Sequence, residues 1–322
     1  MPARSIALLV LVTAVWGVNF VLIHKGLEHF PPLLFNALRF ALMAVPAIFL
    51  VGRPRVPWRY VLGIGATLGV VKFGLLFVSI DQGLPVGLSS LLLQLQVVFT
   101  IAFASFALRE RPRREQVAGA AIAFAGLTVI GIDRAASAPI LPFALIVGAA
   151  AAWGVSNTLT RMAQPPDALA LLVWASLVAP LPLLGLSFAF EGPAEIGDAM
   201  AGVDVAGVAA LLFVALVSGL FGFAAWIALL KRHTAAAVTP FALLVPVFGI
   251  ASAALLIGER PSALELAGAA LICAGLAATL KPPRTPAPAG APGAGRGIRG
   301  RRRRSSWPAG SGRPAAEHGP VR

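Results

Sequence analysis

The sequence predicts an all-α membrane protein with ten transmembrane helices, arranged as two inverted five-helix repeats. Three observations predict this class. Apolar residues make up 58% of the 322-residue chain and charged residues only 12%. Apolar segments of membrane-spanning length follow one another along the chain, and short motifs of the first half return in the second. A soluble domain of this length needs far more surface charge, so the bilayer is the expected solvent.

Two motifs carry the internal repeat. The segment Ala14–Asn19 returns in closely similar form as Ala151–Ser156. A Glu-Arg-Pro element occurs in each of the segments 105–126 and 254–275, which share nine identities in 22 aligned positions. Self-similarity of this kind indicates a duplicated unit.

The lengths of the apolar segments set the number of predicted helices. A bilayer core of roughly 30 Å needs about 20 apolar residues per helix. The fifth and tenth segments are the shortest and the richest in Gly and Ala, so their assignment as full spans is less secure than that of the others. The alternative is tight packing against neighbouring helices. An odd number of spans in each unit places the second copy upside down relative to the first, as is typical of transporters. The predicted spans are 5–24, 33–51, 60–80, 86–108, 116–132, 139–160, 168–190, 205–229, 235–257 and 264–280.

The predicted organisation has three parts. Residues 1–135 form the first five-helix repeat and residues 136–281 the second. Residues 282–322 are crowded with Pro, Gly and Arg and lack an apolar period, which predicts a disordered basic tail. Beside a membrane, such a tail is expected to meet anionic lipid headgroups rather than nucleic acid.

Lys and Arg are unevenly distributed between the predicted loops. One side of the membrane receives the basic loops around residues 53–59 and 109–114, whereas the other receives only Lys25, Arg134 and Arg260. Because cytoplasmic loops collect Lys and Arg, this pattern predicts that both termini are cytoplasmic.

Two basic residues within the predicted spans are candidates for substrate binding. Lys72 lies about midway along the third span, where a lysine costs roughly 2.5 to 3.5 kcal/mol. Contact with a substrate carboxylate in a water-lined cavity and snorkelling or backbone contact explain Lys72 about equally well. Arg39 lies close to the outer start of the second span. Snorkelling to the interface is therefore slightly favoured over a bidentate grip on a carboxylate.

The fourth span contributes two amides to the same candidate site. Gln94 and Gln96 are two residues apart, so they point about 200° apart around a helix and do not face one cavity together. Either amide suits a small polar solute, and interhelical hydrogen bonding is an equally good explanation.

The duplicated Trp-Gly motif supplies the remaining candidates. Trp16 and Asn19 share a face of the first span, as Trp153 and Asn157 share a face of the sixth. These residues line a cavity between the halves in one interpretation. In the other, which we favour for the tryptophans, the glycines permit close helix approach while the indoles pack.

The ionisable residues argue against an enzyme. All 13 carboxylates lie at segment ends, in loops or in the tail, and the single cysteine, Cys273, lies inside the last span. A hydrolase in the membrane needs a constellation of His, Asp, Glu or Cys at membrane depth. The sequence therefore predicts no catalytic residues, no metal site and no cofactor.

Several motifs recur together between about residues 5 and 280. They are the Trp16–Phe20 opening, the Pro31-Pro32 start of the second span with Arg39-Phe40, the stretch Gly87–Gln96, and the two Glu-Arg-Pro elements, each followed by an Ala-Gly-Ala-Ala helix. Together they resemble the EamA-type branch of the drug/metabolite transporter superfamily, whose members are built from two five-helix copies. Arg109 departs from the family pattern, which commonly has glycine at this position, as Gly258 is in the second copy.

Within that branch, the first half is similar to bacterial exporters of amino-acid metabolites of the cysteine and O-acetylserine type. This resemblance implies efflux of a small zwitterionic solute across the bacterial inner membrane by alternating access. A multidrug or dye exporter of the same superfamily is the alternative, and an integral-membrane enzyme or sensor is a more distant one. The expected partners are a small-molecule substrate and membrane lipids. The oligomeric state stays open, with a homodimer as one option.

Overall fold

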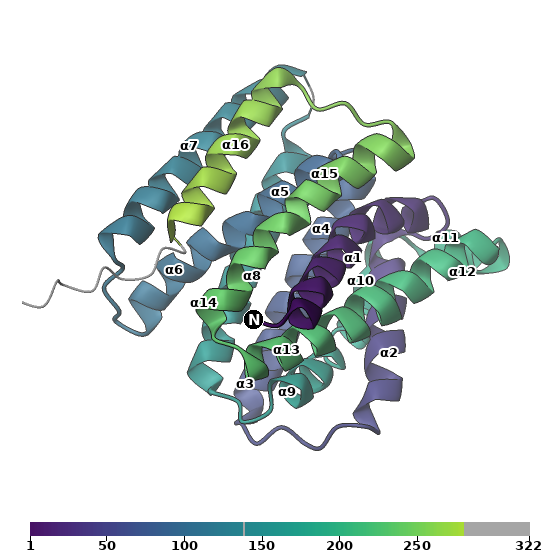
Figure 1. Ribbon diagram of the computed structural model, residues 1–322. Coiled ribbons are helices and arrows are strands. Elements are labelled where there is room, and N and C mark those ends of the chain that lie inside the picture. The colour runs from purple at the N-terminus through teal and green to yellow at the C-terminus, as the bar shows by residue number, and fades with distance from the viewer. Residues whose placement is uncertain (138, 280–322) are drawn as a thin grey trace, which may run out of the picture. The chain divides into compact units, whose positions relative to one another are not determined.

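The computed structural model describes residues 1–279 with the exception of residue 138 (Figure 1). The predicted tail, 282–322, lies outside the described residues. Helices and their connections make up this whole part of the chain, as predicted for an all-α protein. The first half contains α1 (Ala3–Leu27), α2 (Pro32–Ile48), α3 (Trp58–Ile64), the π-helix η1 (Gly65–Lys72), α4 (Phe73–Asp81), α5 (Val86–Leu92), the 3-10 helix η2 (Leu93–Leu95), α6 (Gln96–Ala107) and α7 (Arg114–Ser137).

The second half follows the same order with two differences: its second apolar segment is divided into α9 and α10, and the short exposed helix α11 is added. Its elements are α8 (Leu141–Ala163), α9 (Ala168–Ser176), α10 (Pro180–Phe190), α11 (Pro193–Ala201), α12 (Val205–Leu212), the π-helix η3 (Phe213–Phe221), α13 (Gly222–Arg232), α14 (Ala235–Val238), the 3-10 helix η4 (Thr239–Leu243), α15 (Leu244–Ile257) and α16 (Ala263–Thr279).

Eight helical segments within the described chain are long and apolar enough to cross a membrane. Two further apolar helices, α2 and α16, are shorter. The tenth predicted span is thus short, as expected. The fifth predicted span is not short, because α7 has a full membrane-spanning length. The second predicted span, which corresponds to α2, is short instead.

Departures from α-helical geometry fall at corresponding places in the two halves. The π-helix η1 interrupts the third apolar segment, Trp58–Asp81, and the π-helix η3 interrupts its counterpart between α12 and α13. The 3-10 turns η2 and η4 likewise lie within the segments that end in α6 and α15. Pro240 lies within η4, where the absence of its backbone N–H prevents a regular helix.

The Trp-Gly helices pack reciprocally across the two halves. At Gly17 of α1, a Cβ atom would overlap the backbone of Phe248 and Gly249 on α15. At Gly154 of α8, it would come within 2.9 Å of the Phe99 carbonyl carbon on α6. Each glycine therefore allows its helix to lie directly against a helix of the opposite half.

The helices α7 and α16 form a closely packed pair, which lies side by side in Figure 1. Gly119 and Gly275 face each other across this contact, and a side chain on either would meet the other's carbonyl oxygen. The tight packing considered for the fifth and tenth spans is therefore present, and each has the other as its neighbour.

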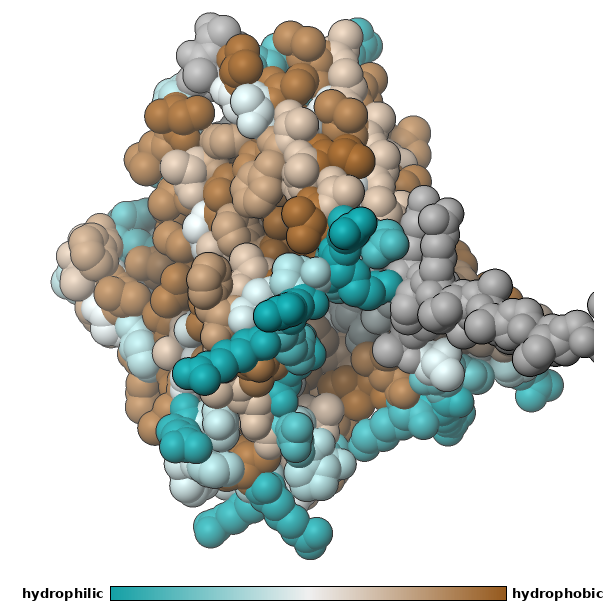
Figure 2. Space-filling model, turned by 90° about the vertical axis from the view of Figure 1, so that its left-hand side faces the viewer, coloured by the Kyte–Doolittle hydropathy of each residue, from teal (hydrophilic) through white to brown (hydrophobic). Residues whose placement is uncertain are grey.

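Large apolar side chains cover much of the outer surface. Figure 2 shows them over a broad part of one face, with hydrophilic side chains gathered in the lower part of that view. Phe106 and Leu255, for example, are 85% and 83% exposed. Such a surface is unfavourable in water and suits contact with lipid chains.

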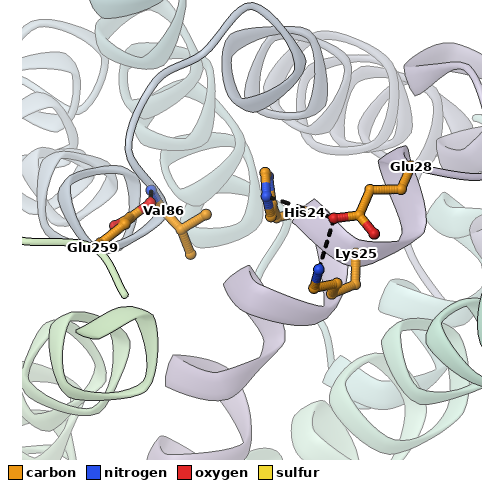
Figure 3. Close-up of polar contacts among 5 residues, drawn as sticks. All are labelled: His24, Lys25, Glu28, Val86 and Glu259. Atoms are coloured by element: carbon orange, nitrogen blue, oxygen red, sulfur yellow. Dashed lines mark hydrogen bonds and ion pairs between the residues drawn. The ribbon is translucent and has the colours of Figure 1, made fainter. Parts of the chain in front are cut away.

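Two glutamates cap helices that belong to the other half of the chain. At the start of α5, the carboxylate of Glu259 accepts hydrogen bonds from two backbone N–H groups, that of Val86 at 2.6 Å and that of Gly87 at 2.9 Å. Figure 3 shows the contact with Val86. Glu191 accepts hydrogen bonds from Leu33 and Leu34 at the start of α2. Since these N–H groups have no partner within their own helices, each carboxylate fixes a helix end of the first half to a loop of the second.

Candidate functional site

Lys72 is the last residue of η1 and lies inside the bundle. Its side chain is 3% exposed, and its Nζ atom lies 3.1 Å from the ring centroid of Phe73 and 4.5 Å from that of Trp153. Trp153 comes from α8 of the second half. The aromatic faces partly compensate the ammonium for lost water, because their quadrupoles attract a cation. Lys72 therefore does not snorkel.

Arg39, in the middle of α2, is 1% exposed. Its guanidinium carbon lies 3.7 Å from the ring centroid of Phe73 and 4.9 Å from that of Phe40. The slightly favoured expectation that Arg39 snorkels to the interface is wrong, because neighbouring helices cover it. Its Nε and Nη1 atoms are buried without a hydrogen-bond partner among the described residues.

The two cations share the ring of Phe73. The Arg39 guanidinium carbon lies 3.7 Å and the Lys72 Nζ atom 3.1 Å from the centroid of this ring, so the two cationic groups are close together. They repel each other strongly, because the dielectric constant inside the bundle is low. No carboxylate of the described chain forms an ion pair with either one. Two buried like charges without a counter-charge are unfavourable, and an anionic group bound between them relieves the repulsion.

Two buried amide oxygens complete the set of polar atoms without partners. Asn19 Oδ1 on α1 and Asn36 Oδ1 on α2 have no donor among the described residues. Asn36 was not among the residues predicted from the sequence. Its position three residues before Arg39, on the same helix face, was the available signal.

The predicted glutamines contact helices of the second half. Gln94, in η2, donates from its Nε2 atom to the Ala242 carbonyl at 2.8 Å. Gln96 accepts at Oε1 from Asn157 Nδ2 at 2.6 Å, and Asn157 Nδ2 also lies 3.1 Å from Thr100 Oγ1. Both glutamines thus make interhelical hydrogen bonds in this structure.

The two duplicated tryptophans lie in different surroundings. Trp16 donates from its ring nitrogen to the Ser218 carbonyl of η3 at 3.1 Å and contacts the rings of Phe223 and Trp226. Trp153 instead faces the Lys72 ammonium. The structure therefore brings together Lys72, Arg39 and Trp153, whereas Trp16 packs on the π-helix of the other half.

A surface pocket lies elsewhere, beside the Glu259 cap between α5 and α16. Its lining includes Leu91, Ile250 and Pro261 but neither Lys72 nor Arg39. Among the described residues, no group of three His, Cys, Asp or Glu side chains is placed to hold a metal ion. The buried cation pair is the candidate site that this geometry favours.

The duplicated pattern has a counterpart in known sequences. The EamA-like transporter family matches the chain twice, over residues 3–132 and again over residues 141–281. The chain belongs to this family. It is accordingly a membrane transporter rather than an enzyme, and the family resemblance stated from its motifs is confirmed.

Curated relatives agree with this assignment. A protein of Salmonella typhimurium named "Probable amino-acid metabolite efflux pump" is 42% identical over 276 residues, which cover 84% of this chain and 92% of the relative. An Escherichia coli protein of the same name is 38% identical over 282 residues. This match covers 86% of this chain and 94% of the relative. A "Probable terminal-alkyne amino-acid exporter" of Streptantibioticus cattleyicolor is 26% identical over 85% of this chain and 92% of the relative.

A solved crystal structure shares the fold. It matches with a TM-score of 0.58 at 21% sequence identity and covers 86% of this chain and 96% of the matched chain.

Proposed function

We propose that this protein exports small amino-acid-like metabolites across the bacterial inner membrane by alternating access. The similarity to relatives named as amino-acid metabolite efflux pumps supports the substrate class. The observation that carries the proposal is the pairing of Lys72 and Arg39 on the ring of Phe73 without a carboxylate partner. A substrate carboxylate is the group that this pair lacks.

The proposed architecture is ten spans in two inverted repeats, residues 1–135 and 136–281. Three findings support it: the family matches each half separately, the π- and 3-10 breaks recur at corresponding places, and α1 and α8 each pack on a helix of the opposite half. From the distribution of Lys and Arg, we place both termini in the cytoplasm. The basic tail, 282–322, would then meet anionic lipid on that side.

In the proposed mechanism, the substrate carboxylate binds between Lys72 and Arg39 while the wall formed by Trp153 excludes water. Desolvation strengthens the attraction, because charges interact more strongly at low dielectric constant. Both cations of the site come from the first half. The helix η3, which is the counterpart of η1 in the second half, contains no charged residue. The irregular helix η1 contributes Lys72, and the irregular helix η3 packs against α2, which carries Arg39. Broken helices often accompany the site in other carriers. Relative movement of the halves then exposes the bound solute to one side of the membrane at a time.

The remaining candidates have supporting roles in this proposal. Gln94 now bonds η4, and Gln96 and Asn157 bond each other. These hydrogen bonds exchange for substrate contacts when the halves separate. Trp16 supports the opposite wall through η3. The solute is zwitterionic, because a cation pair selects a carboxylate while amino-acid metabolites also bear an amine.

Uptake of labelled solutes into inverted membrane vesicles tests the proposal. Vesicles that contain the protein are expected to accumulate an amino-acid metabolite such as O-acetyl-L-serine above the level of vesicles without it. Adding an imposed proton gradient identifies the coupling. Accumulation of lipophilic dyes without accumulation of any carboxylate-bearing solute would contradict the proposal and favour the multidrug alternative.

A further inference from the structure

Asn36 has a buried side-chain amide of which only the nitrogen end has a hydrogen-bond partner among the described residues. Its side chain is fully buried, at 0% exposed, and its Nδ2 atom donates to the Gly69 carbonyl at 3.2 Å. A carbonyl only accepts, so this contact fixes which end of the amide is nitrogen. The oxygen is then the free end, and it has no donor among the described residues. An unpaired buried acceptor is costly in a folded protein.

The free oxygen lies on the same helix face as the cation. Asn36 and Arg39 are three residues apart on α2, which places their Cβ atoms about 5 to 6 Å from each other. On the facing element, Gly69 and Lys72 are likewise three residues apart in η1. The contact between Asn36 and Gly69 therefore joins α2 and η1 beside the two cations.

The chemistry of these atoms selects a particular ligand. Arg39 offers the free donors Nε and Nη1, whereas Asn36 offers a free acceptor. A simple anion satisfies the donors but turns its negative charge towards the amide oxygen. A molecule with an ammonium group next to its carboxylate satisfies both, and the two groups of an α-amino acid are close enough to reach neighbouring positions on one helix face.

We propose that Asn36 Oδ1 accepts a hydrogen bond from the substrate's α-ammonium group and thereby selects free amines over acylated ones. This inference rests on the proposed function, because it assumes that the carboxylate of the same solute lies between Lys72 and Arg39. Asn19 Oδ1, the other buried acceptor without a donor, offers a further partner for the three N–H groups of an ammonium.

Two isomeric probes isolate the effect. O-acetyl-L-serine has a free amine and N-acetyl-L-serine has an acylated one, while both have a carboxylate, the same atoms and the same mass. The measurement is the ratio of their uptake into inverted vesicles that contain the full chain, below neutral pH to prevent acetyl migration. We expect the protein to prefer the free amine roughly 10- to 100-fold, the range for a hydrogen bond to a charged group.

Substitution of Asn36 tests its role in that ratio. Asn36→Leu keeps the size of the side chain but removes the acceptor, so the ratio is expected to fall to about one. Asn36→Asp places a carboxylate there, which attracts an ammonium group more strongly than an amide does. The ratio of free-amine to acylated-amine uptake is therefore expected to rise above that of the unaltered protein. This holds even if the new carboxylate pairs with Arg39 and lowers both uptakes. A merely structural role changes both uptakes alike. If Asn36→Leu fails to reach the membrane, Asn36→Asp decides alone.

Ser79→Ala is the matched control. Ser79 is also fully buried, and its hydroxyl already donates to the Pro142 carbonyl at 2.7 Å. This variant is expected to lower the amount of folded protein without changing the ratio. The inference is overturned if the ratio is unchanged in Asn36→Leu, lower in Asn36→Asp, or reduced to about one in Ser79→Ala. Equal uptake of both isomers by the unaltered protein also overturns it, whereas uptake of neither isomer contradicts the proposed function itself.

Discussion

Arg109 and Gly258 adopt the same left-handed backbone conformation, with φ angles of 53° and 71°. Each residue directly precedes a Glu-Arg-Pro element, at the end of α6 in one half and of α15 in the other. The turn that leaves these helices therefore requires a positive φ in both copies. Glycine adopts this conformation freely, whereas a side chain at Arg109 is strained there.

Replacing Arg109 by glycine is expected to stabilise the protein. Relief of the left-handed strain outweighs the greater backbone entropy of glycine in the unfolded chain, for a net gain of about 0.5 to 1 kcal/mol. The thermal midpoint of the detergent-solubilised protein measures this gain. The matched variant Gly258→Ala, at the equivalent turn, is expected to lower the midpoint. A lower midpoint for Arg109→Gly would show that its side chain makes a contact worth more than the strain.

Removing the charge of Lys72 is expected to abolish most transport while membrane insertion is retained. Lys72→Met keeps an unbranched side chain of similar length against Phe73 and Trp153 but cannot attract a carboxylate. Loss of a charge-assisted contact lowers uptake into inverted vesicles by roughly 10- to 100-fold. Lys25→Met is the control, because Lys25 is exposed and pairs only with Glu28 at 2.7 Å.

Unchanged uptake by Lys72→Met would remove Lys72 from the site. If Arg39→Met also transports normally while Trp153→Leu fails, the multidrug alternative gains support, because aromatic walls then matter more than charge.

The Glu259 cap is expected to contribute measurably to stability. Glu259→Ala leaves the N–H groups of Val86 and Gly87 without their acceptor, a loss of about 1 to 3 kcal/mol. Glu110 is the equivalent residue of the first copy and pairs with the exposed Arg161 at 2.8 Å. Glu110→Ala is expected to cost at most about 1 kcal/mol, since surface ion pairs contribute little. Equal thermal midpoints for the two variants would contradict the assigned role of Glu259.

Asp167, at the start of α9, makes the stability of the fold depend on pH in the acidic range. Partial burial raises the pKa of this carboxyl, but hydrogen bonds from the N–H groups of Ala170 and Leu169, together with Lys231, outweigh burial and lower its pKa from the usual 3.8. A lowered folded-state pKa stabilises the fold above the unfolded value, and this contribution is lost as pH falls through the folded value.

The thermal midpoint is therefore expected to fall below about pH 4 partly through Asp167. Asp167→Asn, which cannot titrate, should flatten that part of the profile while it retains a helix cap. Asp198→Asn, the same exchange at an exposed carboxylate, is the control for the loss of one acidic side chain. Identical acid limbs for Asp167→Asn and the unaltered protein would exclude this contribution.

The positions of the polar residues show where prediction from sequence stopped. The cost of a mid-span lysine singled out Lys72, and its burial on aromatic rings agrees with that reasoning. The same reasoning misplaced Arg39, because distance from the helix end was taken as access to the interface. Neighbouring helices cover it instead, among them α4 with Phe73 and Phe77. Asn36 was missed although it lies three residues before Arg39, since an amide in a membrane helix is ordinary until its partners are known.

The sequence by itself determined that this chain is an all-helical, duplicated membrane transporter, because the apolar runs, the low charge and the repeated motifs are local properties of the chain. Only the tertiary structure decided which polar atoms meet. The pairing of Lys72 with Arg39 on Phe73, the reach of Glu259 to α5 and the free oxygen of Asn36 all depend on contacts between different helices. Helical periodicity sets the face on which a residue lies, whereas packing between helices sets what that face meets.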